Sequence, residues 1–364
     1  MTPARQQTIA LDVMGSDGGV AGIVAGGLEA ARKMGGAVHI VLVGREPDIQ
    51  QVLDQEENLP TNISIRHASE EVPMHISATD GARMRDSSIR VGLKEVRRQE
   101  ADAFVSPGNT GAVMASSLLT LGRIQGVHRP AITSAFPTVT GRPTVVLDVG
   151  ANADCKPAHL YQFGIMGSVY FEHRFNVEAP RVGLLSIGEE RSKGNELIFN
   201  ARKLLKESDI NFVGNIEGRD VLAGIVDVAV TDGFTGNIIL KFAESIKPML
   251  VKSMQRQVQT NFFSRIGATL LLPFLRRMRN RFDYAEAGGA PLLGVNGIVI
   301  IAHGSSNSKA ICNAIGVACD MVGREVTNRI RDELVTNHFG QKNGSKDKSQ
   351  DNRDRIICAD PSSD

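Results

Sequence analysis

The stretch ADAFVSPGNTGAVMASSLLTLG, residues 101–122, contains the three parts that decide the fold. An apolar run at 103–106 is typical of a strand, a turn of small residues follows at 106–111, and residues 112–122 have helical periodicity. A strand whose residues are nearly all apolar is buried on both faces, which is characteristic of parallel sheets. The stretch therefore predicts one strand–turn–helix unit of an α/β protein.

The same unit recurs along the chain. Further apolar runs predict strands at residues 8–13, 38–43, 63–67, 144–149, 182–187, 211–213, 227–231 and 297–302. Helical periodicity is found at residues 79–98, 157–174, 195–207 and 309–332. This alternation predicts an α/β fold with a mostly parallel sheet covered by helices. Because no internal repeat or linker divides the chain, we expect residues 1–339 to form a single domain.

Two segments depart from the alternation. Residues 245–282 have a helical pattern without a strand, which predicts a helical excursion that protrudes from the α/β body. Residues 340–364, GQKNGSKDKSQDNRDRIICADPSSD, are polar and charged and have almost no apolar pattern. They are expected to form a disordered tail.

Charge and cysteine content exclude several classes of protein. The 41 basic and 40 acidic residues leave a net charge of +1, which argues against a nucleic-acid binder that relies on a broad positive field. The 4 cysteines show neither a CxxC pair nor metal-finger spacing, so we expect no disulfide framework and no metal site. Neither a secretory signal nor a run of eighteen apolar residues is found, which predicts a cytoplasmic protein without a spanning helix.

Five strand-to-helix turns carry the small residues that anion binding needs; they lie at residues 15–19, 106–111, 148–152, 232–237 and 303–306. Glycine lets the backbone approach an anion closely, and the start of a helix presents free N–H groups. Any one turn taken alone is better explained as an ordinary connection, but five in one chain favour an anion-binding crevice. The candidate binding residues are Gly108, Asn109, Thr110, Gly111, Asn152, Asp232, Gly233, Gly236 and Ser305.

The absence of nucleotide-binding and nucleophile motifs restricts the kind of anion and of chemistry. No GxGxxG opens a helix after a strand and no GxxxxGK[ST] is found, so a phosphate held without nucleotide machinery is the simpler interpretation. No GxSxG elbow is found, and the lone Cys155 is more often inert packing than a nucleophile. Phosphate that itself attacks a thioester would need no nucleophile from the protein.

Three side chains are candidates for the chemistry. Lys193 precedes a predicted helix, where it binds phosphate, polarises a carbonyl, or is simply exposed. A cation at a helix start opposes the helix dipole, which favours a functional role. Asn237 either caps its helix or donates to an oxyanion, and capping is the commoner role. His303 ends an apolar strand, where it either protonates a leaving thiolate or is a satisfied strand-end histidine.

The helical excursion carries a separate signal. Residues 262–281 join bulky apolar side chains to five arginines, and Pro273 is expected to break the helix and leave an apolar tip. Such a tip suits an anionic membrane surface, but from the pattern alone a subunit interface or core packing is the simpler explanation. The tip residues are Leu270, Leu271, Leu272, Phe274 and Leu275.

At these turns the sequence closely resembles the phosphate acyltransferase family of phospholipid synthesis (the PlsX type). The matching segments run from about residue 8 to residue 330 in the family's order. They are LDVMGSDGG, SPGNTGAVMASSLLTLGR, VVLDVGAN with QFGIMGSVY, VGLLSIGEERSKGNEL, NFVGNIEGRD, DGFTGNIILK and GGAPLLGVNGIVIIAHGSSNSKAI. Departures are modest: family members usually have Ala where Pro107 stands and often Cys where Thr231 stands.

The resemblance implies transfer of a long-chain acyl group from acyl carrier protein to orthophosphate. The acyl phosphate then feeds a membrane glycerol-3-phosphate acyltransferase. It also implies a fold like that of isocitrate and isopropylmalate dehydrogenases, a homodimer, no metal or organic cofactor, and peripheral contact with the inner face of the cell membrane. Membrane contact through the excursion is attributed to the family, which favours that interpretation of residues 270–275.

Two other functions are compatible with parts of the pattern. A dehydrogenase of the related fold would need a dinucleotide and a metal, for which no fingerprint or paired carboxylates are found. A non-catalytic scaffold at the membrane surface would bind acyl carrier protein without turning it over.

Overall fold

The computed structural model describes residues 5–258 and 288–336. In these residues eleven strands form one sheet in the order β3-β2-β1-β4-β11-β10-β5-β6-β9-β7-β8. The strands are β1 (Gln7–Asp12), β2 (Val38–Gly44), β3 (Ile63–His67), β4 (Ala103–Ser106), β5 (Ala131–Phe136), β6 (Thr144–Leu147), β7 (Val182–Leu185), β8 (Phe212–Ile216), β9 (Val228–Val230), β10 (Ala290–Leu293) and β11 (Ile298–Ile301).

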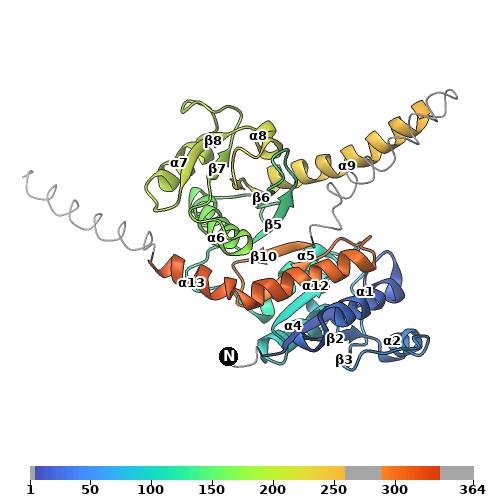
Figure 1. Ribbon diagram of the computed structural model, residues 1–364. Helices are drawn as coiled ribbons and strands as arrows, with labels where there is room; N and C mark the ends of the chain where they lie inside the picture. Colours follow the sequence, from blue (N-terminus) through green and yellow to red (C-terminus); the bar gives the residue numbers. More distant parts are fainter. Residues whose placement is uncertain (1–4, 259–287, 337–364) are drawn as a thin grey trace, which may run out of the picture.

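The sheet consists of two parallel halves that run in opposite directions. β3, β2, β1, β4 and β11 are mutually parallel and form the first half, and β6, β9, β7 and β8 form the second. Between them, β10 is antiparallel to β11 and to β5, and β5 is antiparallel to β6. Because of these three successive antiparallel pairings, the strands of the second half run opposite to those of the first. Figure 1 shows the first half below and the second above.

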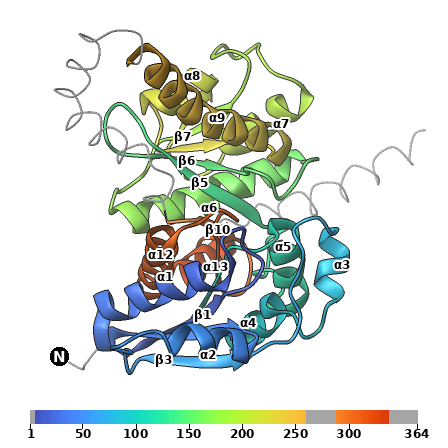
Figure 2. The same ribbon diagram turned by 90° about the vertical axis from the view of Figure 1, so that its right-hand side faces the viewer.

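Helices cover both faces of the sheet. They are α1 (Gly19–Met34), α2 (Glu46–Leu53), α3 (Ala78–Arg83), α4 (Ser88–Arg97), α5 (Thr110–Thr120), α6 (Pro157–Phe175), α7 (Glu196–Lys206), α8 (Gly218–Ala223), α9 (Gly233–Val258), α12 (Ser308–Gly323) and α13 (Val326–Thr336). One apolar cluster joins the sheet to α1, α2, α6, α7, α12 and α13, and the other joins it to α4, α5, α8 and α9. Thus α5 in the first half and α9 in the second lie on the same side (Figures 1 and 2).

The α/β class and the mostly parallel sheet are confirmed, and every strand predicted from an apolar run is present. The runs are buried throughout in β4, β6, β9 and β11, as strands covered on both faces require. Sequence periodicity missed β5 and β10. These two short strands carry the antiparallel pairings that reverse the sheet.

Three observed helices differ in their bounds from the predicted ones. The helix expected at 79–98 is two helices, because Ser87 caps α4 by accepting a hydrogen bond from the Arg90 N–H. The helix expected at 309–332 is also divided, where Glu325 adopts a positive φ of 53° between α12 and α13. The excursion expected at 245–282 begins earlier, since α9 already starts at Gly233. Its remainder, including the predicted tip at 270–275, and the predicted tail at 340–364 lie outside the described residues.

Candidate active site

Three turns of the first half lie together where β1, β4 and β11 end. The N–H of Asp17 donates to the Gly304 carbonyl over 2.9 Å, and that of Ala302 donates to the Ser106 carbonyl over 2.8 Å. Gly15 has a φ of 74°, and a Cβ there would lie 3.5 Å from the Cα of Gly108. We call residues 14–19, 106–111 and 303–306 the first cluster.

Two helices that start in the first cluster differ in how their first turns are satisfied. The Asn109 side chain caps α5 by accepting from the Ala112 N–H, and it also donates to the carbonyls of Met74 and Ile76. Asn109 is therefore engaged in holding the turn, although it was predicted as a ligand. In contrast, α1 begins after Gly18, with no side-chain cap and no acidic residue in its first turn. The Gly19 N–H donates to the Ser16 carbonyl, and the N–H groups that follow it are open to an anion.

Free N–H groups flank that opening. The amides of Val20 and Ala21 in α1 and of Thr110 and Gly111 in α5 have no acceptor in the described structure. Such groups favour a negative ligand because each carries a partial positive charge at the helix start. The predicted residues Thr110 and Gly111 thus provide two of these free N–H groups, and Gly108 lies in the same turn.

Asp12 is a residue of this cluster that the sequence analysis missed. It ends β1, is fully buried, and its Oδ2 accepts from the Ser106 hydroxyl over 2.6 Å. Its Oδ1 accepts from the Met14 N–H over 3.0 Å. Burial raises the pKa of Asp12 to about 6. A carboxylate at the end of an otherwise apolar strand is the signal that could have found it.

His303 and Ser305 belong to the first cluster and contact each other. The Nδ1 of His303 lies 2.8 Å from the Ser305 hydroxyl and accepts from the Ser305 N–H over 3.2 Å. An acceptor at Nδ1 leaves the proton of the neutral ring on Nε2. In this tautomer the Nε2–H of His303 is a hydrogen-bond donor.

A second cluster lies where β6 and β9 end, at residues 148–152 and 231–237. Asp148 is buried and its carboxylate accepts from the N–H groups of Ile132, Gly150, Ala151 and Asn152. Asn152, which was predicted to bind phosphate, donates its side-chain amide to Asp148 and to the Pro130 carbonyl. Its amide nitrogen is therefore engaged in holding the turn.

An aspartate of the same turn caps the start of α9. Asp232 accepts from the N–H and the hydroxyl of Thr235, both over 2.8 Å, and so caps the helix. Gly233 and Gly236 allow tight packing, since a Cβ on Gly236 would lie 1.9 Å from the Asp148 carbonyl oxygen. Asn237 is exposed one turn into the helix, so the capping role considered for it is wrong.

Lys193 stands at the same edge of the second half. It is exposed and follows β7 in a turn whose carbonyls at Glu190 and Lys193 accept from the Asn215 side chain. Asn195, not Lys193, caps α7. In the second cluster, burial raises the pKa of the Cys155 thiol beside Asn152 to about 11, which keeps it protonated and unreactive at neutral pH.

In a wholly parallel sheet the five turns would all follow strands that run in one direction. Here they fall into two clusters. The first cluster lies at the carboxyl ends of strands that run opposite to those of the second.

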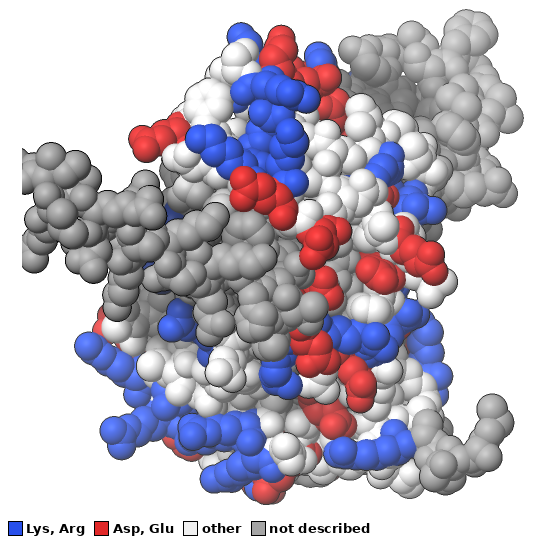
Figure 3. Space-filling model, turned by 90° about the vertical axis from the view of Figure 1, so that its left-hand side faces the viewer, with Lys and Arg blue, Asp and Glu red and all other residues white. Residues whose placement is uncertain are grey.

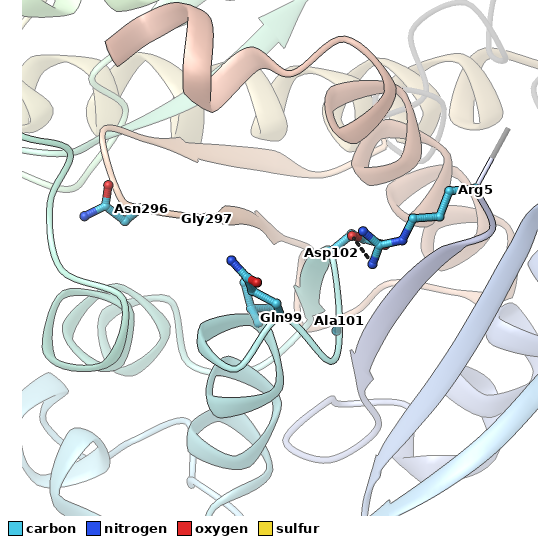
Figure 4. A pocket seen from close by; sticks show the side chains of 7 residues that line it. Arg5, Gln99, Ala101, Asp102, Asn296 and Gly297 are labelled. Atoms are coloured by element: carbon cyan, nitrogen blue, oxygen red, sulfur yellow. Dashed lines mark ion pairs between the residues drawn. The ribbon is translucent and has the colours of Figure 1, made fainter. Parts of the chain in front are cut away.

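Two cavities in the described residues lie away from both clusters. One of about 480 Å³ is lined by residues that precede β4 and β11, among them Asp102 and Asn296, at the edge opposite the first cluster (Figure 4). Arg5 forms an ion pair with Asp102 over 3.4 Å at this cavity. The other, of about 290 Å³, lies between α1, α6 and α12.

Charge on the face shown in Figure 3 is mixed, with Lys and Arg interspersed among Asp and Glu. This agrees with the net charge of +1. In the described ranges no three His, Cys, Asp or Glu side chains are grouped so as to hold a metal ion. Nor is any described helix long and apolar enough to cross a membrane.

Comparison with known proteins identifies the family. A family model described as "Fatty acid synthesis protein" matches residues 7–329. A phosphate acyltransferase of Trichlorobacter lovleyi is 44% identical over 331 residues, 91% of this chain and 95% of that protein. One from Nostoc punctiforme is 46% identical over 330 residues, 90% and 96% of the two chains. This chain belongs to the phosphate acyltransferase family.

Solved structures with the same fold include members of other families. A phosphotransacetylase from Streptococcus pyogenes matches with a TM-score of 0.60 and 16% identity, covering 87% of this chain and 94% of that one. The EutD phosphotransacetylase from Staphylococcus aureus gives 0.57 and 18%, covering 88% and 95%. At these identities the likeness shows the fold alone, which confirms the α/β class.

Proposed function

We propose that this protein transfers a long-chain fatty acyl group from acyl carrier protein to orthophosphate, forming acyl phosphate. Membership of the phosphate acyltransferase family, with relatives 44–46% identical over about nine-tenths of the chain, supports acyl transfer to phosphate. The observation that carries the proposal within the structure is the uncapped start of α1 beside the free amides of α5. It offers phosphate a site built from backbone alone.

In the proposed reaction a phosphate oxygen attacks the thioester carbonyl, the carbon–sulfur bond breaks, and the thiolate leaves with a proton. Gly108, Thr110, Gly111 and Ser305 surround the nucleophile, and the helix starts favour its negative charge. The proton on the leaving thiol balances the one that hydrogen phosphate loses on forming acyl phosphate, and the Nε2–H of His303 is proposed to hydrogen-bond the departing sulfur. This requires no nucleophilic side chain, which agrees with the raised pKa of Cys155.

The second half is proposed to meet the acyl donor. Lys193 and Asn237 are the exposed cationic and amide side chains of that edge, and either can donate to a carbonyl on which negative charge develops. Asp232, Gly233 and Gly236 shape the turn that carries Asn237. Because Asp232 already caps α9, we assign this edge to the donor rather than to phosphate.

The test is incubation of purified protein with acyl carrier protein thioester over a series of phosphate concentrations. Free thiol and hydroxylamine-trapped acyl phosphate should appear together and saturate with phosphate. The same assay with acyl coenzyme A identifies the donor. A carrier that stays acylated at every phosphate concentration would leave the scaffold hypothesis in place of the enzyme.

We further propose a homodimer that acts on the inner face of the cell membrane and passes acyl phosphate to a membrane glycerol-3-phosphate acyltransferase. The support is the sequence pattern of residues 262–281 and the family membership. Flotation with anionic vesicles tests the membrane part. Leu271→Glu should lose vesicle binding and keep activity in solution, whereas retained binding would favour a subunit interface.

A further inference from the structure

Asp12 is a buried acid without an opposing charge. Its side chain has 0% exposure, and in the described parts of the chain no Lys, Arg or His forms an ion pair with it. The groups that bond it are the hydroxyls of Ser106 and Ser88 and the N–H of Met14. A lone carboxylate in such a place is costly to ionise, so it responds strongly to any charge that arrives nearby.

Asp12 also connects the two turns that provide the free amides. Ser106 bonds Asp12 and at the same time accepts from the Gly108 N–H over 3.1 Å, which holds the start of the 106–111 turn against β1. A Cβ on Gly108 would lie 3.3 Å from Oδ2 of Asp12. The carboxyl group is thus in van der Waals reach of the turn in which phosphate is proposed to bind.

We propose that Asp12 is a positioning residue of the phosphate site, and that it takes up a proton from solvent when phosphate binds. This rests on the proposed function, in which phosphate occupies the first cluster. An anion beside a buried carboxylate repels it and raises its pKa further. By linkage, the protonated form binds the anion more tightly, so affinity falls as pH rises through the range in which Asp12 ionises.

The hydrogen-bond chain survives in both protonation states. When Asp12 is ionised, the Ser106 hydroxyl donates to it; when Asp12 is protonated, its own O–H donates to Ser106. In either state Ser106 retains a lone pair for the Gly108 N–H. The turn therefore keeps its shape while the buried charge is removed.

Other charged groups stand on the elements around Asp12. They are Asp17 on the β1 turn, Glu71 on the loop before α3, Arg90 on α4 and His303 on the β11 turn. Glu71 raises the pKa of Asp12, in the same direction as burial. Of these, His303 is the imidazole of the same cluster, so the experiment must separate it from Asp12.

The test is calorimetric titration with sulfate at pH 7 in buffers of different ionisation enthalpy, which counts protons exchanged per anion bound. Sulfate remains dianionic across this pH range, so its own protonation does not contribute. The pKa of Asp12 is about 6 without the anion, and a bound anion is expected to raise it above 7. We therefore expect the wild type to take up roughly half a proton or more per sulfate bound. Asp12→Asn should take up almost none, and its sulfate affinity should vary little between pH 5.5 and 7.5.

Two variants serve as controls. Asp17→Asn removes an exposed carboxylate from the same turn and should keep the wild-type uptake. His303→Asn should keep it too; a loss of uptake there, with normal uptake in Asp12→Asn, would assign the proton to His303 and overturn the inference. Ser106→Ala retains the Asp12 carboxyl but lacks the bond to Gly108. It should bind sulfate about tenfold more weakly while still taking up a proton.

The outcomes separate the inference from the function on which it rests. Sulfate binding to the wild type without proton uptake would overturn the role of Asp12 and leave the phosphate site intact. Absence of sulfate binding, with phosphate-dependent thiol release also missing, would overturn the site itself. Unchanged affinity in Ser106→Ala would overturn the positioning role even if Asp12→Asn failed to fold.

Discussion

In the first half of the molecule β1 leads into Leu11-Asp12-Val13, and in the second half β6 leads into Leu147-Asp148-Val149. Both aspartates are fully buried, and each lies against the glycine of a neighbouring S/T-x-G turn: a Cβ on Gly108 would come within 3.3 Å of Asp12, and one on Gly233 within 2.7 Å of Asp148. The local sequences and the packing are therefore alike.

The hydrogen-bond partners of the two aspartates differ. Asp148 accepts from four backbone N–H groups and from the side-chain amide of Asn152, so the donors oppose the rise in pKa that burial causes. Asp12 has only one backbone donor, Met14, besides serine hydroxyls. The amides of the 148–152 turn are used on Asp148 and that of Thr235 on Asp232, whereas those of Val20, Ala21, Thr110 and Gly111 in the first half have no acceptor among the described residues. This difference supports the proposal that phosphate binds in the first cluster.

The largest effect is expected from adding a methyl group where the second half is most tightly packed. Gly236→Ala would place a Cβ 1.9 Å from the Asp148 carbonyl oxygen, so the strand end and α9 must separate. We expect a loss of about 3 kcal/mol or more in the free energy of unfolding, measured by urea denaturation. Gly22→Ala, in α1 with open space around it, should be neutral or stabilising. Equal stability of the two variants would contradict the described packing.

The next effect is a pH dependence of stability that belongs to Asp12. Its pKa is raised from 3.8 to about 6 in the folded state, so between these values the folded state holds a proton that the unfolded state has lost. The free energy of unfolding therefore falls as pH rises through this window, by roughly 3 kcal/mol in total. In phosphate-free buffer, Asp12→Asn should gain about this much relative to wild type between pH 4 and 7. A stability difference that stays constant with pH would argue against it.

The next effect concerns the turnover number of variants at two side chains of the second half. Asn237→Ala and Lys193→Ala should each lower kcat by about 100-fold, as loss of one oxyanion donor does, without lowering the melting temperature. Lys241→Ala on the same exposed stretch of α9 is the matched control and should keep full activity. Unchanged kcat in both test variants would remove the second half from the chemistry.

The smallest effect concerns phosphate affinity in the first half. Gly108→Ala places a methyl group 3.2 Å from the Ser106 hydroxyl and 3.3 Å from Asp12, which displaces the turn by a few tenths of an ångström. The KM for phosphate should rise about tenfold, roughly 1.4 kcal/mol, with a smaller change in the KM for the acyl donor. Gly218→Ala, which meets open space at the start of α8, should leave both constants unchanged.

Sequence alone predicted the strand–turn–helix units because each strand is a short apolar run and each turn is marked by glycine. It missed β5 and β10, since AITSAF and APLL are short and their antiparallel pairing depends on partners far along the chain. Without these two strands, the opposite direction of the two halves could not be predicted. The capping role of Asn237 was wrong because Asp232 lies at the helix start, and Asp12 was missed because its burial is a tertiary property.

The most direct test of the account is hydrogen–deuterium exchange with and without phosphate. We predict that phosphate slows exchange of the amides at residues 18–21 and 109–112, where the helix starts of the first half are open, and leaves residues 232–237 unchanged. Protection confined to residues 232–237, with none in the first half, would contradict the account.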